Sequence, residues 1–125
     1  MSSFLPVNGW LHYTNQHRKS LETMNRSRVN RRVDMSFQKA TGENLGEGLK
    51  RYTWSGVRVN SDEYVDFQLE AQRNELVISA GYLIDPVENI YSVQTGPRHP
   101  NVMIMTLHNA ATVDVEVHLW LVVKE

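Results

Sequence analysis

The five histidines are the side chains of this chain best suited to acid–base or metal chemistry, and they lie at His12, His17, His99, His108 and His118. Asp114, Glu116 and His118 alternate with apolar residues, so they share one face of an expected strand, with neighbours about 7 Å apart. Carboxylates and imidazoles are ligands of divalent transition metals, and His108 is the nearest further donor in the sequence. Because one flat row of a strand seldom surrounds an ion, a hydrated outer face is the better interpretation, and we expect no metal site.

Other catalytic arrangements have less support. The chain contains no cysteine, which excludes disulfides, thiolate metal sites and a cysteine nucleophile. It has no G-x-S-x-G motif, and the glycines of residues 42–48 are not followed by the Lys-Ser/Thr pair of a phosphate-binding loop. We therefore predict a non-enzymatic protein that needs no cofactor. A metal-dependent enzyme around His108, Glu116 and His118 is the weakest of the alternatives that stay open.

The charge of the chain is unevenly distributed. Residues 1–50 hold 8 Lys/Arg against 4 Asp/Glu, whereas residues 51–125 hold 5 against 10, so a net charge of −1 conceals halves of +4 and −5. A basic segment before an acidic body suggests a phosphate-rich partner or self-assembly. The pI near 6.5 and the acidic body argue against nucleic acid as a partner. The sequence has no apolar run long enough to span a membrane, so we expect no membrane partner.

These charges favour assembly with protein partners, most simply as a homo-oligomer. The expected anchors are Phe4, Leu5 and Trp10, each contributing on the order of 2 kcal/mol if a neighbouring subunit covers it. Pairing with acidic residues of the neighbour would fix orientation more than affinity. The basic residues expected to pair in this way are Arg26, Arg28, Arg31 and Arg32.

The fold class follows from the period-2 alternation of apolar and polar residues after residue 50. Val113, Val115, Val117, Leu119, Leu121 and Val123 give the longest such run. About six strands are expected in 75 residues, with turns between them and no long helical pattern. The prediction is an all-β protein: an antiparallel β-sandwich or barrel of about 6–8 strands at residues 51–125. Residues 1–50 are expected to form an extended basic N-terminal arm, with a glycine-rich connector at residues 41–48.

A second functional hypothesis concerns the segment Thr95-Gly96-Pro97-Arg98-His99-Pro100-Asn101, which its glycine and prolines predict to be a loop. Loops of β-sandwiches that carry such polar residues often bind sugars. A carbohydrate-binding, lectin-like module is therefore the main alternative to a structural protein. Its expected ligand-binding residues are Arg98, His99 and Asn101.

The C-terminal run Val102-Met103-Ile104-Met105-Thr106-Leu107-His108-Asn109-Ala110-Ala111-Thr112-Val113-Asp114-Val115-Glu116-Val117-His118-Leu119-Trp120-Leu121-Val122-Val123 resembles the closing hairpin of small β-sandwich structural proteins of tailed-phage virions. In those proteins a strand ending in Asn and small residues turns into a long valine-rich strand. The resemblance covers about 22 residues. It implies a non-enzymatic bacteriophage subunit, such as a capsid decoration, adaptor or tail protein. Such a subunit would contact other virion proteins and reside in the virion after assembly in the host cytoplasm.

Overall fold

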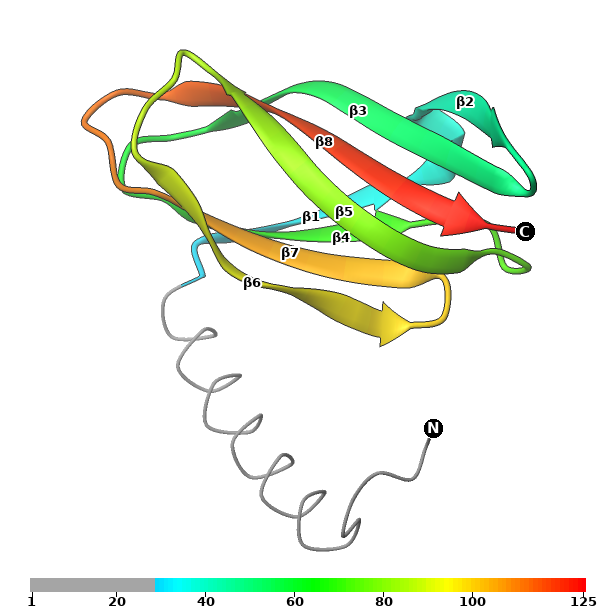
Figure 1. Ribbon diagram of the computed structural model, residues 1–125. Coiled ribbons are helices and arrows are strands. Elements are labelled where there is room, and N and C mark those ends of the chain that lie inside the picture. The colour runs from blue at the N-terminus through cyan, green and yellow to red at the C-terminus, as the bar shows by residue number, and fades with distance from the viewer. Residues whose placement is uncertain (1–28) are drawn as a thin grey trace, which may run out of the picture.

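The protein is a two-layer β-sandwich in the computed structural model, which describes residues 29–125 (Figure 1). The first sheet has the order β1-β4-β7-β6 and the second the order β2-β3-β8-β5. The strands are β1 (Arg31–Ser36), β2 (Thr41–Gly46), β3 (Leu49–Val59), β4 (Tyr64–Glu70), β5 (Leu76–Asp85), β6 (Ile90–His99), β7 (Val102–Asn109) and β8 (Val115–Lys124). A single 3₁₀ turn, Phe37–Lys39, joins β1 to β2. The structure thus confirms the predicted all-β sandwich.

The core lies between the sheets and is built from the inward faces of their central strands. Val117, Leu119, Leu121 and Val123 of β8 are fully buried, as their alternation predicts. From the other sheet, β4 and β7 contribute buried side chains that include Phe67. Alternate burial along each strand therefore closes one hydrophobic core, and the opposite faces of both sheets are left for solvent or partners.

The first strand corrects the expected domain boundary. β1 pairs with β4 in parallel, with Arg32 opposite Asp66 and Asp34 opposite Gln68. Val33 and Met35 point inward and pack against the core. The sandwich therefore begins at Arg31, and the boundary expected at residue 51 was wrong. A parallel partner so far along the chain leaves no local signal, because only antiparallel neighbours can be joined by a short turn.

The glycine-rich segment is also part of the sheet. Residues 41–48 form β2 and its turn into β3, so the prediction of a connector between arm and body was wrong. Gly46 and Gly48 have φ values of +92° and +80°, which the tight turn requires and which side-chain-bearing residues rarely adopt. The glycines serve a β-hairpin rather than a linker. None of the helical segments described is long and apolar enough to span a membrane.

Candidate functional site

A row of polar side chains crosses the outer face of the first sheet. On the central strands, the Thr106 hydroxyl donates to Oδ1 of Asp66 at 3.3 Å and accepts from Nε2 of Gln94 at 3.2 Å. Nε2 of Gln68 lies 3.5 Å from the other Asp66 oxygen. Neighbouring strands bring these residues together because Asp66 and Thr106 are paired in the β4–β7 register. The outer face is thus an organised polar surface.

Asp66 sits at the centre of this row at an electrostatic cost. Burial raises the pKa of its carboxyl above the ordinary value, and the Thr106 hydrogen bond and the positive charge of Arg32 offset only part of that effect. A carboxylate whose ionised form is disfavoured by its surroundings is more common at functional sites than on ordinary surfaces. This makes the outer face of the first sheet the first place to look for a site.

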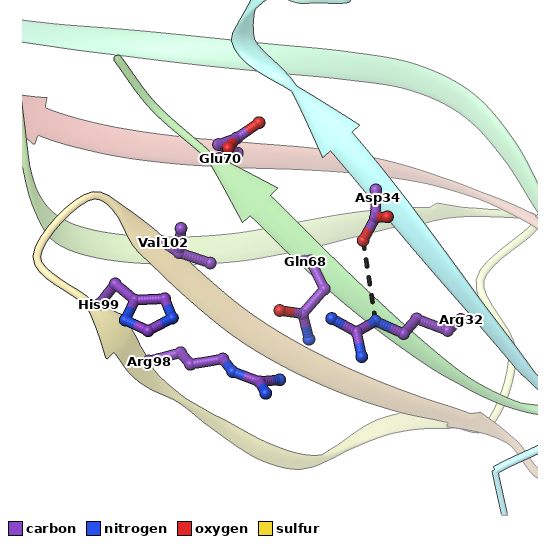
Figure 2. A pocket seen from close by; sticks show the side chains of 7 residues that line it. All are labelled: Arg32, Asp34, Gln68, Glu70, Arg98, His99 and Val102. Carbon is purple, nitrogen blue, oxygen red and sulfur yellow. Dashed lines mark ion pairs between the residues drawn. The ribbon is translucent and has the colours of Figure 1, made fainter. Parts of the chain in front are cut away.

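An open pocket of about 320 Å³ lies beside the row and draws on all four strands of the sheet (Figure 2). Its lining is mostly polar and combines positive, negative and neutral groups. The lining residues are Arg32, Asp34, Gln68, Glu70, Arg98, His99 and Val102. Nε of Arg32 lies 3.7 Å from Oδ1 of Asp34, a surface ion pair of little energetic weight. The pocket offers several hydrogen-bond donors and acceptors within one small surface.

Residues that were predicted from the sequence to have two different roles line the same pocket. Arg32 was expected to bind a protein partner, and Arg98 and His99 were expected to bind a ligand. Asp34, Gln68 and Glu70 were missed as site residues. The alternation of β4 indicates that Gln68 and Glu70 share a face, but the sequence gives no sign that β1 lies beside them.

Two details of the expected ligand loop need correction. β6 continues through His99, so Arg98 and His99 belong to an edge strand and only the two residues that follow form the turn. Pro97 is tolerated because β6 is an edge strand with an irregular register at that point. Asn101 does not line the pocket; its Nδ2 donates to the carbonyl of Ala71 at 3.2 Å and ties the turn to the end of β4.

The remaining residues expected to bind a partner fall into two groups. Arg31 lies on β1, where its guanidinium pairs with Glu63 at 3.1 Å and donates to the carbonyl of Arg58. An acidic partner expected on a neighbouring subunit is thus found for Arg31 within its own chain. Phe4, Leu5, Trp10, Arg26 and Arg28 lie outside the described residues.

The metal alternative around His108 was wrong in its grouping. His108 is on β7 of the first sheet, whereas Glu116 and His118 are on β8 of the second. The imidazole of His108 is stacked on Tyr64 and lies within hydrogen-bond distance of Asp62 and the Tyr91 hydroxyl, at 3.2 and 2.9 Å. Within residues 29–125, no three His, Cys, Asp or Glu side chains are placed to hold a metal ion.

One protein-family model matches this chain. The model of the YjdH family matches residues 31–123, which run from the first residue of β1 nearly to the end of β8. The chain belongs to the YjdH family. The matched range coincides with the sandwich of this YjdH-family chain and so supports a single domain that begins at Arg31. No curated protein and no solved structure gave a match.

A second surface of the YjdH-family domain is apolar and lies on β5, at one edge of the second sheet (Figure 1). The side chains of Leu76, Ile78 and Leu83 are 53%, 55% and 67% exposed. On the neighbouring strand β8, the indole of Trp120 lies against Gly81, where an added Cβ would come within 2.3 Å of the ring. Exposed apolar surface of this kind is typical of interaction sites.

Proposed function

We propose that this protein is a non-enzymatic structural subunit that assembles with copies of itself through the free edge of β5. The observation that carries the proposal is a nine-residue stretch, 76–84, without a single charged residue on an edge strand. Peptide groups at a sheet edge can pair with another strand, and natural proteins usually block such pairing with charges, proline or bulges.

The other three sheet edges carry such protection. β1 has three charged residues in six, and β2 carries Glu43 and a register irregularity. β6 contains Pro97, which has no N–H to donate, and two register irregularities. β5 has one irregularity, near its start, where the N–H of Val77 bonds to the carbonyl of Pro100. The remainder of β5 is the least protected edge of the described sandwich.

The occupant that best fits this edge is a second copy of the same strand. Two identical strands that meet across a twofold axis run antiparallel and bring the same apolar residues together. Residues 76–84 contain no charged side chain, so no like charges oppose each other over this stretch in such a pair. The absence of opposed like charges therefore favours self-pairing.

The virion location belongs to this proposal only through the resemblance of the C-terminal hairpin to tailed-phage proteins. The YjdH family match neither names a virion component nor names another function. Docking of Phe4, Leu5 and Trp10 on a neighbouring subunit likewise stays a prediction, since these residues lie outside the described range.

The test is the mass of the protein in solution, measured by light scattering during size-exclusion chromatography at micromolar concentrations. The full chain is expected at about 29 kDa, twice its mass of 14.4 kDa. Ile78→Lys and Leu83→Lys place an ammonium group on the free edge and are expected to weaken the dimer by about tenfold or more. Both residues are exposed, so the fold should tolerate either change.

Leu45→Lys is the matched control, because Leu45 is a 42% exposed leucine on β2, the opposite edge of the same sheet. It should leave the dimer intact. A full chain that is monomeric at micromolar concentrations would contradict the proposal. Equal disruption by Leu45→Lys and Leu83→Lys would also contradict it, because the effect would then not belong to β5.

A further inference from the structure

We propose that the pocket on the outer face of the first sheet binds an uncharged, polyhydroxylated ligand, a saccharide, independently of assembly through β5. The pocket lies on the sheet opposite the one that contains β5. The proposal rests on the chemistry of the lining, on the convergence of its arginines and on an unused polar group at its centre.

The lining has the composition that hydroxyl groups require. Arg32 and Arg98 supply only donors, Asp34 and Glu70 supply only acceptors when ionised, and Gln68 supplies both. Every sugar hydroxyl can donate and accept at once, so vicinal hydroxyls match planar side chains that present two polar atoms each. The two arginines of the lining balance its two carboxylates. An anion would gain little there, whereas a neutral ligand meets donors and acceptors in similar number.

The geometry directs these groups toward a common centre. Figure 2 shows the guanidinium groups of Arg32 and Arg98 extending from β1 and β6, the two edge strands, toward Gln68 on β4 between them. Gln68 is only 5% exposed as a whole residue, and its Nε2 is turned to Asp66, while its Oε1 stays accessible to solvent and accepts no hydrogen bond from residues 29–125. Val102 adds a small apolar wall, which suits the C–H face of a sugar ring. The volume of about 320 Å³ is at the lower end of small-molecule sites.

Within residues 29–125, two charged groups on the outer face of the first sheet do not contribute to stability through ion pairs. Arg98 has no ion-pair partner within the described part of the chain, although Asp66 and Glu70 lie on the same sheet face. Asp66 is held in surroundings that raise the pKa of its carboxyl, so its charge costs stability. An unpaired arginine and a carboxyl with a raised pKa on one sheet face are consistent with a ligand that completes their hydrogen bonds.

The test is a titration of the ¹⁵N-labelled full chain, followed by NMR, with glucose, galactose, mannose, N-acetylglucosamine, maltose and cellobiose at millimolar concentrations. At least one saccharide is expected to shift amide signals of β1, β4, β6 and β7 around the pocket. Sodium sulfate and sodium glucuronate serve as anionic probes at the same ionic strength. Shifts confined to the pocket with a neutral saccharide support the proposal.

Arg98→Gln and Gln68→Leu are each expected to lower the affinity for that saccharide by about tenfold, since each removes hydrogen bonds to the ligand. Arg98 is exposed, so this variant should fold even if Gln68→Leu does not. Arg58→Gln, an equal charge change on the second sheet, should leave the affinity unchanged. The proposal is overturned if no neutral saccharide shifts the pocket signals, if sulfate binds as well as the saccharide, or if Arg58→Gln weakens binding as much as Arg98→Gln.

Discussion

At the scale of single residues, Glu75 is a buried carboxylate, only 1% exposed, that lies immediately before β5. Its Oε1 accepts from the Tyr52 hydroxyl at 2.7 Å and from the N–H of Gln72 at 2.9 Å, and its Oε2 pairs with Nζ of Lys50 at 3.0 Å. Burial by itself would raise the pKa of Glu75, but these hydrogen bonds and the Lys50 charge outweigh it and lower the pKa. They also raise the pKa of Lys50 above its ordinary 10.5.

We therefore expect Glu75→Gln to lower the free energy of unfolding at pH 7 by about 1–3 kcal/mol, because a charged acceptor with three donors is lost. Because the pKa of Glu75 is lower in the folded state, the stabilisation by its carboxylate is fully present above the unfolded pKa of 4.5. This stabilisation is lost as the pH falls through the folded pKa. The Lys50 contribution is fully present below its unfolded pKa of 10.5 and is lost as the pH rises from there through the raised folded pKa. Urea unfolding at pH 7 and pH 3 checks this, with Glu88→Gln as an exposed control. An equal loss at both pH values would contradict the prediction.

Unlike Glu75, Asp66 is expected to destabilise the folded state when its carboxyl is ionised. Because its surroundings raise the pKa of the carboxyl, its ionised form makes the folded state less stable at pH 7 than a neutral group would. Asp66→Asn should therefore leave the melting temperature at pH 7 unchanged or raise it, and the difference should vanish as the pH falls and the wild-type carboxyl becomes protonated. Scanning calorimetry at pH 7 and pH 4 measures both. A marked loss of stability at pH 7 would show that the polar row is structural.

At the scale of elements, alternation predicted central strands after residue 50, such as β8, because these strands bury one face. Val117 and Leu119 on β8 illustrate this, since period 2 translates directly into burial. Alternation fails where a strand is at an edge or pairs far along the chain. β1 alternates through Val33 and Met35, but its parallel partner β4 left no signal. β6 passes through Gly96 and Pro97, which are typical of loops, because an edge strand tolerates both.

The turn of the β2–β3 hairpin depends on a glycine with a positive φ. Gly46 has a φ of +92° with no heavy atom within 4 Å of an added Cβ, so Gly46→Ala tests the backbone conformation alone. It is expected to lower the free energy of unfolding by about 1 kcal/mol. Gly96 is the matched control: its surroundings are equally open, but its φ is not positive, so Gly96→Ala should be close to neutral. Chemical denaturation of both variants decides, and equal effects would contradict the explanation.

At the scale of the whole molecule, the candidate site depends on topology more than on any local pattern. Arg98 and His99 stand out in the sequence as polar residues near glycine and proline, and Arg32 stands out as part of a basic run. They reach one pocket only because β1 and β6 are the two edges of a four-stranded sheet whose middle strands are β4 and β7. A sequence can show which side chains carry chemistry, but the order of strands decides which of them meet.

The same topology predicts that the sandwich is independent of the residues that precede it. Both sheets, the core between them and the β5 edge lie within residues 29–125, and no buried side-chain polar atom of this range lacks a hydrogen-bond partner. A chain without residues 1–28 should therefore unfold cooperatively, with a melting temperature within a few degrees of the full chain, and should dimerise with similar affinity through β5. Calorimetry and light scattering on both chains measure this. A truncated chain that folds but is monomeric, beside a dimeric full chain, would assign assembly to the N-terminal segment that carries Phe4, Leu5 and Trp10. The charge-free edge of β5 would then need another explanation, because the fold alone does not require it.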